Sequence, residues 1–280
     1  MKQIVLIITL FWFSIHTFGQ TTYTGYIDKY PIELLADIYS DGSTNAIYCY
    51  SKFDEPILIK GALKNKKLTL FEKDKNNKNT ASLQFENYDS QKNELVGIWT
   101  DLNTKKQLKI TLNKSLDKDP KEIMQAVSLE NNYFKLIISN GNVIGVKILE
   151  KKTDQLLQEI DLECQLWGLN NMAIGDYNFD GIMDFSVFES SYAGPNTSRL
   201  YFLYDTKNKH YFESGFSGVS LEFDSKTKRI FERNQCCAGT SVTTAEYKVV
   251  NNKMVLIKEH CYKWDEKKQD LVERKIQDCQ

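Results

Sequence analysis

The chain lacks an excess of charge of either sign. Its 280 residues carry 36 lysines and arginines against 37 aspartates and glutamates, a formal net charge of −1. A nucleic-acid-binding protein usually carries a basic stripe that contacts phosphates, so this balance argues against that class. Hydrophobic residues make up 41% of the chain. This is enough apolar material for a sizeable core in one large or two ordinary domains, and it excludes wholesale disorder.

Histidine and closely spaced cysteine pairs are also scarce. The chain has three histidines, one of them within the first twenty residues, and no Cys-x-x-Cys motif. Structural zinc sites are usually built from such residues, so we expect no zinc site. The chain also lacks the G-x-S-x-G, G-x-G-x-x-G and Walker motifs, and we expect it not to be an enzyme. A glycosidase-type pair of carboxylates leaves no such motif and stays open as an alternative.

Long apolar runs are missing after the first twenty residues, which read MKQIVLIITLFWFSIHTFGQ. Lys2 precedes an apolar run, and Thr17 and Gly19 are small enough for the subsites of a signal peptidase. We therefore expect residues 1–19 to be a signal peptide. A membrane anchor is the alternative, but the run is shorter than a membrane span requires. The mature protein is expected to be periplasmic or secreted, without integral membrane association.

The cysteine content agrees with export. An even number of cysteines in an exported protein indicates disulfide bonds, and sequence does not select the pairing. Cys236 and Cys237 are adjacent, and a bond between neighbours is strained, so we expect each to pair with a cysteine elsewhere. Four of the six lie from residue 236 onward, which predicts a stapled C-terminal edge. The disulfide candidates are Cys49, Cys164, Cys236, Cys237, Cys261 and Cys279.

Alternation of apolar and polar residues dominates the chain and predicts an all-β protein. Residues 20–113 contain about eight strand-like runs, typical of an antiparallel meander or barrel. Residues 114–122 are polar and contain a proline, which indicates a linker. Residues 123–280 resume the strand pattern, with a strong hairpin signal at Asn140-Gly141. Hairpins at this spacing suit a β-propeller-like domain.

Residues 175–187, GDYNFDGIMDFSV, crowd three carboxylates into nine positions. Such crowding is costly unless a cation lies between them, and calcium takes six to eight oxygen ligands from alternate positions of a loop with glycine at its sixth position. The expected ligands are Asp176, Asn178, Asp180, the backbone carbonyl of Ile182, and Asp184. An Asx-rich surface turn is the alternative, and magnesium suits this ligand set less well. A structural role for the ion is expected, because catalysis requires an open coordination position.

The segment SSYAGPNTS, residues 190–198, follows the acidic loop along the chain. Tyr192 is its only large side chain. It combines a flat apolar ring, few rotatable bonds and a hydroxyl, which suits contact with a protein partner. Ser190, Ser191 and Asn196 are expected to donate or accept hydrogen bonds within the loop or with the partner, and the ion is expected to stiffen the segment. Alternatively, Tyr192 packs over a neighbouring strand end.

The pattern D-x-N-x-D-G-x-x-D between strands resembles the calcium loop of FG-GAP-type repeats on β-propeller blades. With NFDGIMDF, a glycine-containing loop, RLYFLYD and an all-β N-terminal part, the exported chain resembles a bacterial family of periplasmic lysozyme inhibitors. Those proteins serve as immunity proteins against peptidoglycan-cleaving effectors of type IV secretion. The resemblance implies a propeller-like C-terminal domain, calcium held by Asp176, Asn178, Asp180 and Asp184, and Tyr192 in the lysozyme cleft.

The segment SSYAG differs from the Ser-Gly-x-x-Tyr motif of those inhibitors. A secreted adhesion or surface-interaction module with the same calcium loop is therefore the second functional hypothesis. Inhibition itself needs no catalytic group on the inhibitor, because shape and a few anchoring side chains are enough to occupy an enzyme cleft.

Overall fold

A computed structural model describes residues 20–115 and 118–279. The expected signal peptide, residues 1–19, lies outside this part of the chain. Within it the regular structure consists of antiparallel strands and two short 3₁₀ turns, with no α-helix. No helix of the described part is long and apolar enough to cross a membrane. The prediction of an all-β protein is confirmed.

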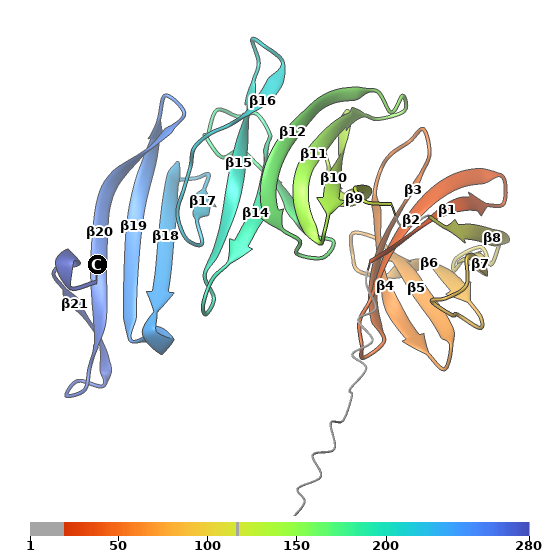
Figure 1. The fold of residues 1–280 in the computed structure, drawn as a ribbon, viewed down its shortest axis with the longest axis horizontal. Coiled ribbons are helices and arrows are strands. Elements are labelled where there is room, and N and C mark those ends of the chain that lie inside the picture. Colours follow the sequence, from red (N-terminus) through yellow and green to blue (C-terminus); the bar gives the residue numbers. More distant parts are fainter. Residues whose placement is uncertain (1–19, 116–117, 280) are drawn as a thin grey trace, which may run out of the picture.

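Eight strands of the N-terminal part form a closed antiparallel barrel (Figure 1). Each strand pairs with the next along the chain, and β1 closes the barrel by pairing with β8. The strands are β1 Thr21–Ile27, β2 Tyr30–Ile38, β3 Ser43–Tyr50, β4 Ile57–Lys64, β5 Lys67–Lys73, β6 Asn79–Phe85, β7 Glu94–Asp101 and β8 Gln107–Lys114. Alternate side chains point inward, and Tyr23, Leu34, Leu68, Phe85 and Ile110 are buried in the barrel core. Closure removes the exposed strand edges that an open sheet would present.

Three further antiparallel sheets follow the barrel. Their strands are β9 Lys121–Ser128, β10 Asn132–Ser139, β11 Asn142–Glu150, β12 Leu156–Gln165, β13 Met172–Gly175, β14 Asp184–Ser191, β15 Thr197–Asp205, β16 His210–Glu213, β17 Glu222–Asp224, β18 Arg229–Cys236, β19 Ser241–Val250, β20 Lys253–Asp265 and β21 Asp270–Arg274. β9 to β12 and β13 to β16 form four-stranded sheets, and β17 to β21 form a five-stranded sheet. The 3₁₀ turns are η1 Cys237–Gly239 and η2 Ile276–Cys279.

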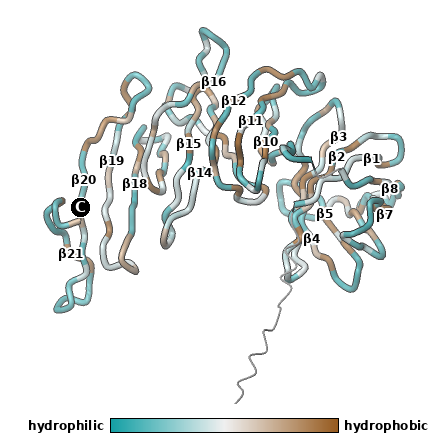
Figure 2. The backbone as a smooth tube through the Cα atoms, viewed as in Figure 1, coloured by the Kyte–Doolittle hydropathy of each residue, from teal (hydrophilic) through white to brown (hydrophobic). Residues whose placement is uncertain are grey.

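The three sheets follow one another in a row from the barrel to the C-terminus (Figure 1). Each is an up-and-down sheet of sequential strands, the arrangement of a propeller blade, so the C-terminal part is β-propeller-like. One core cluster joins Ile47 of the barrel, Phe134 of the first sheet and Phe185 of the second. A separate cluster joins Leu203 of the second sheet to Ile230 of the third. Apolar residues line strands such as β10 and β11, whereas the turn between β20 and β21 is hydrophilic (Figure 2).

Local sequence explains the hairpin between β10 and β11. Asn140 and Gly141 have φ angles of 49° and 78°. Positive φ at both central residues defines the two-residue turn whose twist matches that of the flanking strands, and Asn-Gly tolerates it best. The hairpin prediction is confirmed. The expected linker, 114–122, spans the last residue of β8 and the first two of β9, so the connection between these strands covers residues 115–120.

Polar contacts surround the apolar contact between the barrel and the first sheet. Lys135 of β10 forms an ion pair with Glu33 of β2 at 3.0 Å. Lys151 pairs with Glu55 in the connection between β3 and β4. Asp54 of the same connection is buried, and one of its carboxylate oxygens accepts a hydrogen bond from the backbone N–H of Lys152 at 3.2 Å. Burial and the neighbouring carboxyl of Asp154 raise the pKa of Asp54 to about 6.

This carboxyl pair predicts a pH-dependent stability. Because the pKa of Asp54 is raised in the folded state, its contribution to stability is fully present below its unfolded pKa of about 4 and is lost as the pH rises through about 6. Asp54→Asn removes the charge and suits the φ of 52°. We expect it to raise the free energy of unfolding by about 1 kcal/mol at pH 8, allowing for solvent screening, and to change it little at pH 4.

Denaturant unfolding at pH 4, 6 and 8 checks this expectation. Asp89→Asn is a suitable control, because Asp89 lies in an exposed barrel turn and accepts a local hydrogen bond from the N–H of Gln91 at 3.0 Å. A gain from Asp54→Asn that is equal at pH 4 and pH 8 would contradict the carboxyl–carboxyl repulsion.

Candidate functional site

The acidic loop joins β13 to β14 and alternates in the way its sequence suggests. Tyr177 and Phe179 are buried and pack against the third sheet, with the rings of Tyr177 and Phe223 4.8 Å apart. Asp180 is exposed and Asp176 and Asn178 are half-buried. The aromatic residues therefore anchor the loop, while the oxygen-bearing side chains face away from the core.

Backbone N–H groups of the loop donate to its side chains. The two carboxylate oxygens of Asp176 accept from the N–H groups of Asp180 and Gly181 at 3.0 and 2.9 Å. Asp180 accepts from the N–H of Ile182 at 2.8 Å and from the amide of Asn178 at 2.9 Å. Gly181 has a φ of 91°, which a residue with a Cβ rarely adopts. These contacts curl the loop around its own oxygen atoms.

Asp184, the expected ninth-position ligand, occupies a different environment from the other acids. It is the first residue of β14, 1% exposed, and its two carboxylate oxygens accept hydrogen bonds from the backbone N–H groups of Tyr177 and Tyr204 at 3.0 and 2.9 Å. Burial, opposed by these hydrogen bonds and supported by the charges of Asp180 and Asp176, raises the pKa of Asp184 to about 6. Asp184 therefore ties the loop to both flanking strands.

The donor set was compared with the requirements of calcium. Asp176, Asn178 and Asp180 supply only oxygen donors for an ion, and a carboxylate that accepts two N–H bonds keeps lone pairs free for one. The geometry in the described part of the chain does not gather three acidic, histidine or cysteine side chains around one point. The residue types fit calcium, and the loop side chains must turn inward to bind it.

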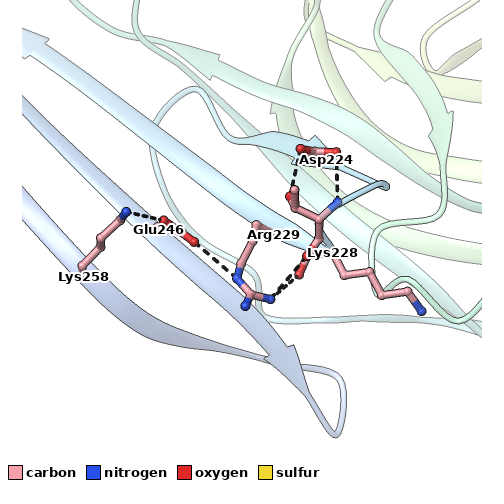
Figure 3. A network of polar contacts seen from close by, with 6 residues as sticks. Asp224, Lys228, Arg229, Glu246 and Lys258 are labelled. Carbon is pink, nitrogen blue, oxygen red and sulfur yellow. Dashed lines mark hydrogen bonds and ion pairs between the residues drawn. The ribbon is translucent and has the colours of Figure 1, made fainter.

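Lys228 is a neighbour of the acidic loop that sequence patterns did not reveal. Its ammonium group donates to the backbone carbonyl of Phe179 at 3.2 Å, from the turn between β17 and β18. In Figure 3 its side chain extends away from the network in which Arg229 contacts Glu246 and Glu246 contacts Lys258. The contact joins residues 49 positions apart in sequence. A positive charge here offsets part of the repulsion between the loop carboxylates.

The second site predicted from sequence, residues 190–198, forms the connection between β14 and β15. Tyr192 is 52% exposed, and its hydroxyl lies 3.2 Å from Oγ of Ser198. Ser190 also bonds Ser198, with their hydroxyl oxygens 2.9 Å apart, and the N–H of Ser191 donates to the side chain of Gln165 at 3.1 Å. The aromatic ring is thus accessible while the base of the loop is held in place.

Asn196 has an internal role instead of the expected exposed one. It is buried, and its amide donates to Oδ1 of Asn234 and to the backbone carbonyl of Gln235 at 3.0 and 2.8 Å. Its own carbonyl oxygen accepts from the N–H of Gln235 at 3.1 Å. All four groups bond to β18, so Asn196 anchors the loop to the third sheet and does not present its side chain to a partner.

The acidic loop and the Tyr192 loop lie at opposite ends of β14. This strand contains eight residues, a length of about 25 Å. The expected direct stiffening of the Tyr192 loop by the ion therefore does not follow from the structure. A bound ion would instead hold the β13–β14 hairpin, whereas Asn196 and the two serines hold the loop at the other end.

The cysteines divide into three kinds. Cys261 of β20 and Cys279 of η2 form a disulfide with their Cα atoms 5.8 Å apart, which staples the C-terminal edge. Cys49 and Cys164 are buried thiols in the cluster between the barrel and the sheets. Cys236 and Cys237 are exposed, and their sulfur atoms lie 2.7 Å apart. The expectation that each of these two pairs elsewhere is not met, because the turn presents them to each other.

Comparisons with known proteins add no family. No protein-family model matches the chain, and neither does any curated protein. Three solved structures resemble parts of its shape. They are Kuenenia stuttgartiensis hydrazine synthase (8% identity, 96% of this chain and 98% of that chain, TM-score 0.29), a protein from Lactobacillus plantarum (8%, 91% and 95%, 0.30), and the β-propeller domain of the trilobed protease from Pyrococcus furiosus (9%, 90% and 84%, 0.24). TM-scores this low establish neither fold nor function.

Proposed function

We propose that this protein is an exported, calcium-stabilised binding protein that inhibits a lysozyme-like peptidoglycan hydrolase. The observation that carries the proposal is Tyr192, an aromatic side chain that is 52% exposed on a loop whose base is held by internal hydrogen bonds. An exposed ring on an ordered loop loses little conformational entropy when it enters a cleft, so it is suited to anchor a complex.

The chemistry of the target fits such an anchor. A lysozyme cleft accommodates a sugar chain between two carboxyl groups. A tyrosine ring can occupy the place of a sugar ring, and its hydroxyl can donate to one of these carboxyls. In the free protein this hydroxyl is 3.2 Å from Ser198, so binding would exchange one polar partner for another.

The ion would act on the scaffold. Calcium held by Asp176, Asn178, Asp180 and the carbonyl of Ile182 would close the acidic loop, with Asp184 reached through water, as the ninth position of calcium loops often is. The bound ion would cancel the repulsion between the carboxylates and stabilise the hairpin that carries β14. The loop that contains Tyr192 leaves the far end of the same strand.

Tyr192→Ala tests the proposed anchor. We expect inhibition of a sensitive lysozyme to weaken about 30-fold or more, because truncating a central aromatic anchor costs about 2 kcal/mol or more. The melting temperature should change little, since most of the side chain is in solvent. The measurement is cell-wall clearing by lysozymes of several glycosidase families, mixed with the purified mature protein.

Tyr26→Ala is the matched control, because Tyr26 is 54% exposed on β1 of the barrel. It should leave inhibition unchanged. Failure of the unmodified protein to inhibit any lysozyme in the panel would sink the proposed function and favour a secreted adhesion or surface-interaction module. Hydrolysis of a glycan by the protein alone would favour a glycosidase.

A further inference from the structure

Cys236 and Cys237 stand where β18 ends and η1 begins. Both are exposed, and their sulfur atoms are 2.7 Å apart. A disulfide bond is about 2.0 Å long. The two sulfur atoms are therefore within about 1 Å of bonding distance without any larger movement of the chain.

The other cysteines leave this pair to itself. Cys261 and Cys279 are already bonded to each other. Burial raises the pKa of the Cys49 and Cys164 thiols to about 12, so these groups are poor nucleophiles and are out of reach of solutes. Across the described part of the chain, the accessible sulfur nearest to each cysteine of the pair is its neighbour.

The backbone of the turn is held in an uncommon conformation. Cys237, Ala238 and Gly239 have φ angles of 57°, 54° and 87° in succession. Two consecutive non-glycine residues with positive φ are costly and persist only where the surroundings hold them. Thr240 supplies part of that restraint, because its N–H and hydroxyl donate to the carbonyl of Cys237 at 3.1 and 2.7 Å. A covalent ring through both sulfur atoms would supply more.

We propose that Cys236 and Cys237 close into a vicinal disulfide, a redox-sensitive element at the edge of the third sheet. The oxidant is a disulfide compound of the exported compartment. One thiolate attacks that disulfide and releases a thiol, and the second thiolate then displaces the other thiol from the mixed disulfide. The pair loses two protons and two electrons, and the oxidant takes them up as two thiols.

The pair lies next to the anchor of the Tyr192 loop. Gln235 directly precedes Cys236 and exchanges two hydrogen bonds with Asn196. The oxidation state of the pair therefore acts on the strand end that holds this loop. Its effect on partner binding rests on the proposed function, whereas the bond itself does not. A ring between adjacent residues removes little chain entropy, so its effect on global stability is small.

Alkylation after oxidation tests the bond. The purified mature protein is incubated with glutathione disulfide, treated with iodoacetamide without denaturant, and mapped by peptide mass spectrometry. We expect Cys236 and Cys237 unalkylated in one peptide that lacks two hydrogens, and both alkylated after mild reduction with a phosphine. Alkylation of both residues in the oxidised sample would overturn the proposal, as would separate glutathione adducts or a bond from either residue to another cysteine.

Paired variants test the local character of the bond. In oxidised protein, the double variant Cys236→Ser, Cys237→Ser should lower the melting temperature by at most about 2 °C, because the ring closes almost no loop. The double variant Cys261→Ser, Cys279→Ser opens a loop with a sequence separation of 18 and should lower it by about 5–10 °C. Equal losses in the two double variants would contradict a local role.

Discussion

Replacing Asp184 with alanine is expected to destabilise the protein by about 3 kcal/mol in EDTA. The side chain is 1% exposed and accepts hydrogen bonds from the backbone N–H groups of Tyr177 and Tyr204. Its removal leaves both donors buried without a partner, and each such loss costs about 1–3 kcal/mol. Denaturant unfolding without calcium measures the loss independently of any ion.

Asp184→Asn is the matched variant. It keeps one side-chain oxygen as an acceptor and the volume of the side chain, and it removes the buried charge. We expect its loss of stability to be less than half that of Asp184→Ala. A loss below about 1 kcal/mol for Asp184→Ala in EDTA would show that the two backbone contacts contribute little, and that Asp184 matters only when an ion is present.

Calcium is expected to raise the melting temperature of the unmodified protein by about 5–10 °C when its concentration is about 100 times the dissociation constant. An ion that binds only the folded state adds about 2.7 kcal/mol at that ratio, and about 1 kcal/mol shifts the melting temperature of a protein of this size by about 2–4 °C. Asp180→Ala should abolish most of the rise. In EDTA it should cost little, because Asp180 is exposed.

Asp101→Ala controls for the loss of an exposed turn. Asp101 accepts from the N–H groups of Asn103 and Thr104 at 2.8 and 2.9 Å, in a barrel turn far along the chain from the acidic loop. This variant should keep the full calcium response. Equal destabilisation of Asp180→Ala with calcium and with EDTA would mean that Asp180 supports the turn and not an ion.

The strands that sequence revealed are those with one buried and one exposed face. The eight strands of the barrel and the hairpin at Asn140-Gly141 follow from alternation and turn chemistry. β9, β12 and β13 did not stand out. β9 was partly assigned to the linker, β12 is an edge strand rich in glutamate and glutamine, and β13 has four residues. Their pairing comes from tertiary context, which a local pattern does not contain.

Site residues show the same division. The loop sequence indicates which side chains carry oxygen atoms and which are apolar, and Tyr177 and Phe179 are indeed buried. It does not indicate that Lys228 reaches the loop or that Asn196 turns inward to β18, because both contacts join residues 39 or more positions apart. It also places the acidic loop and Tyr192 close together along the chain, although β14 separates them in space.

Calorimetric titration of the EDTA-treated protein with calcium tests the central claim most directly, since that claim is a metal ion in the loop between β13 and β14. The account predicts saturable binding of one ion per chain and its loss in Asp180→Ala, with Asp101→Ala unchanged. Absence of saturable binding at millimolar calcium, or unchanged binding in Asp180→Ala, would contradict it.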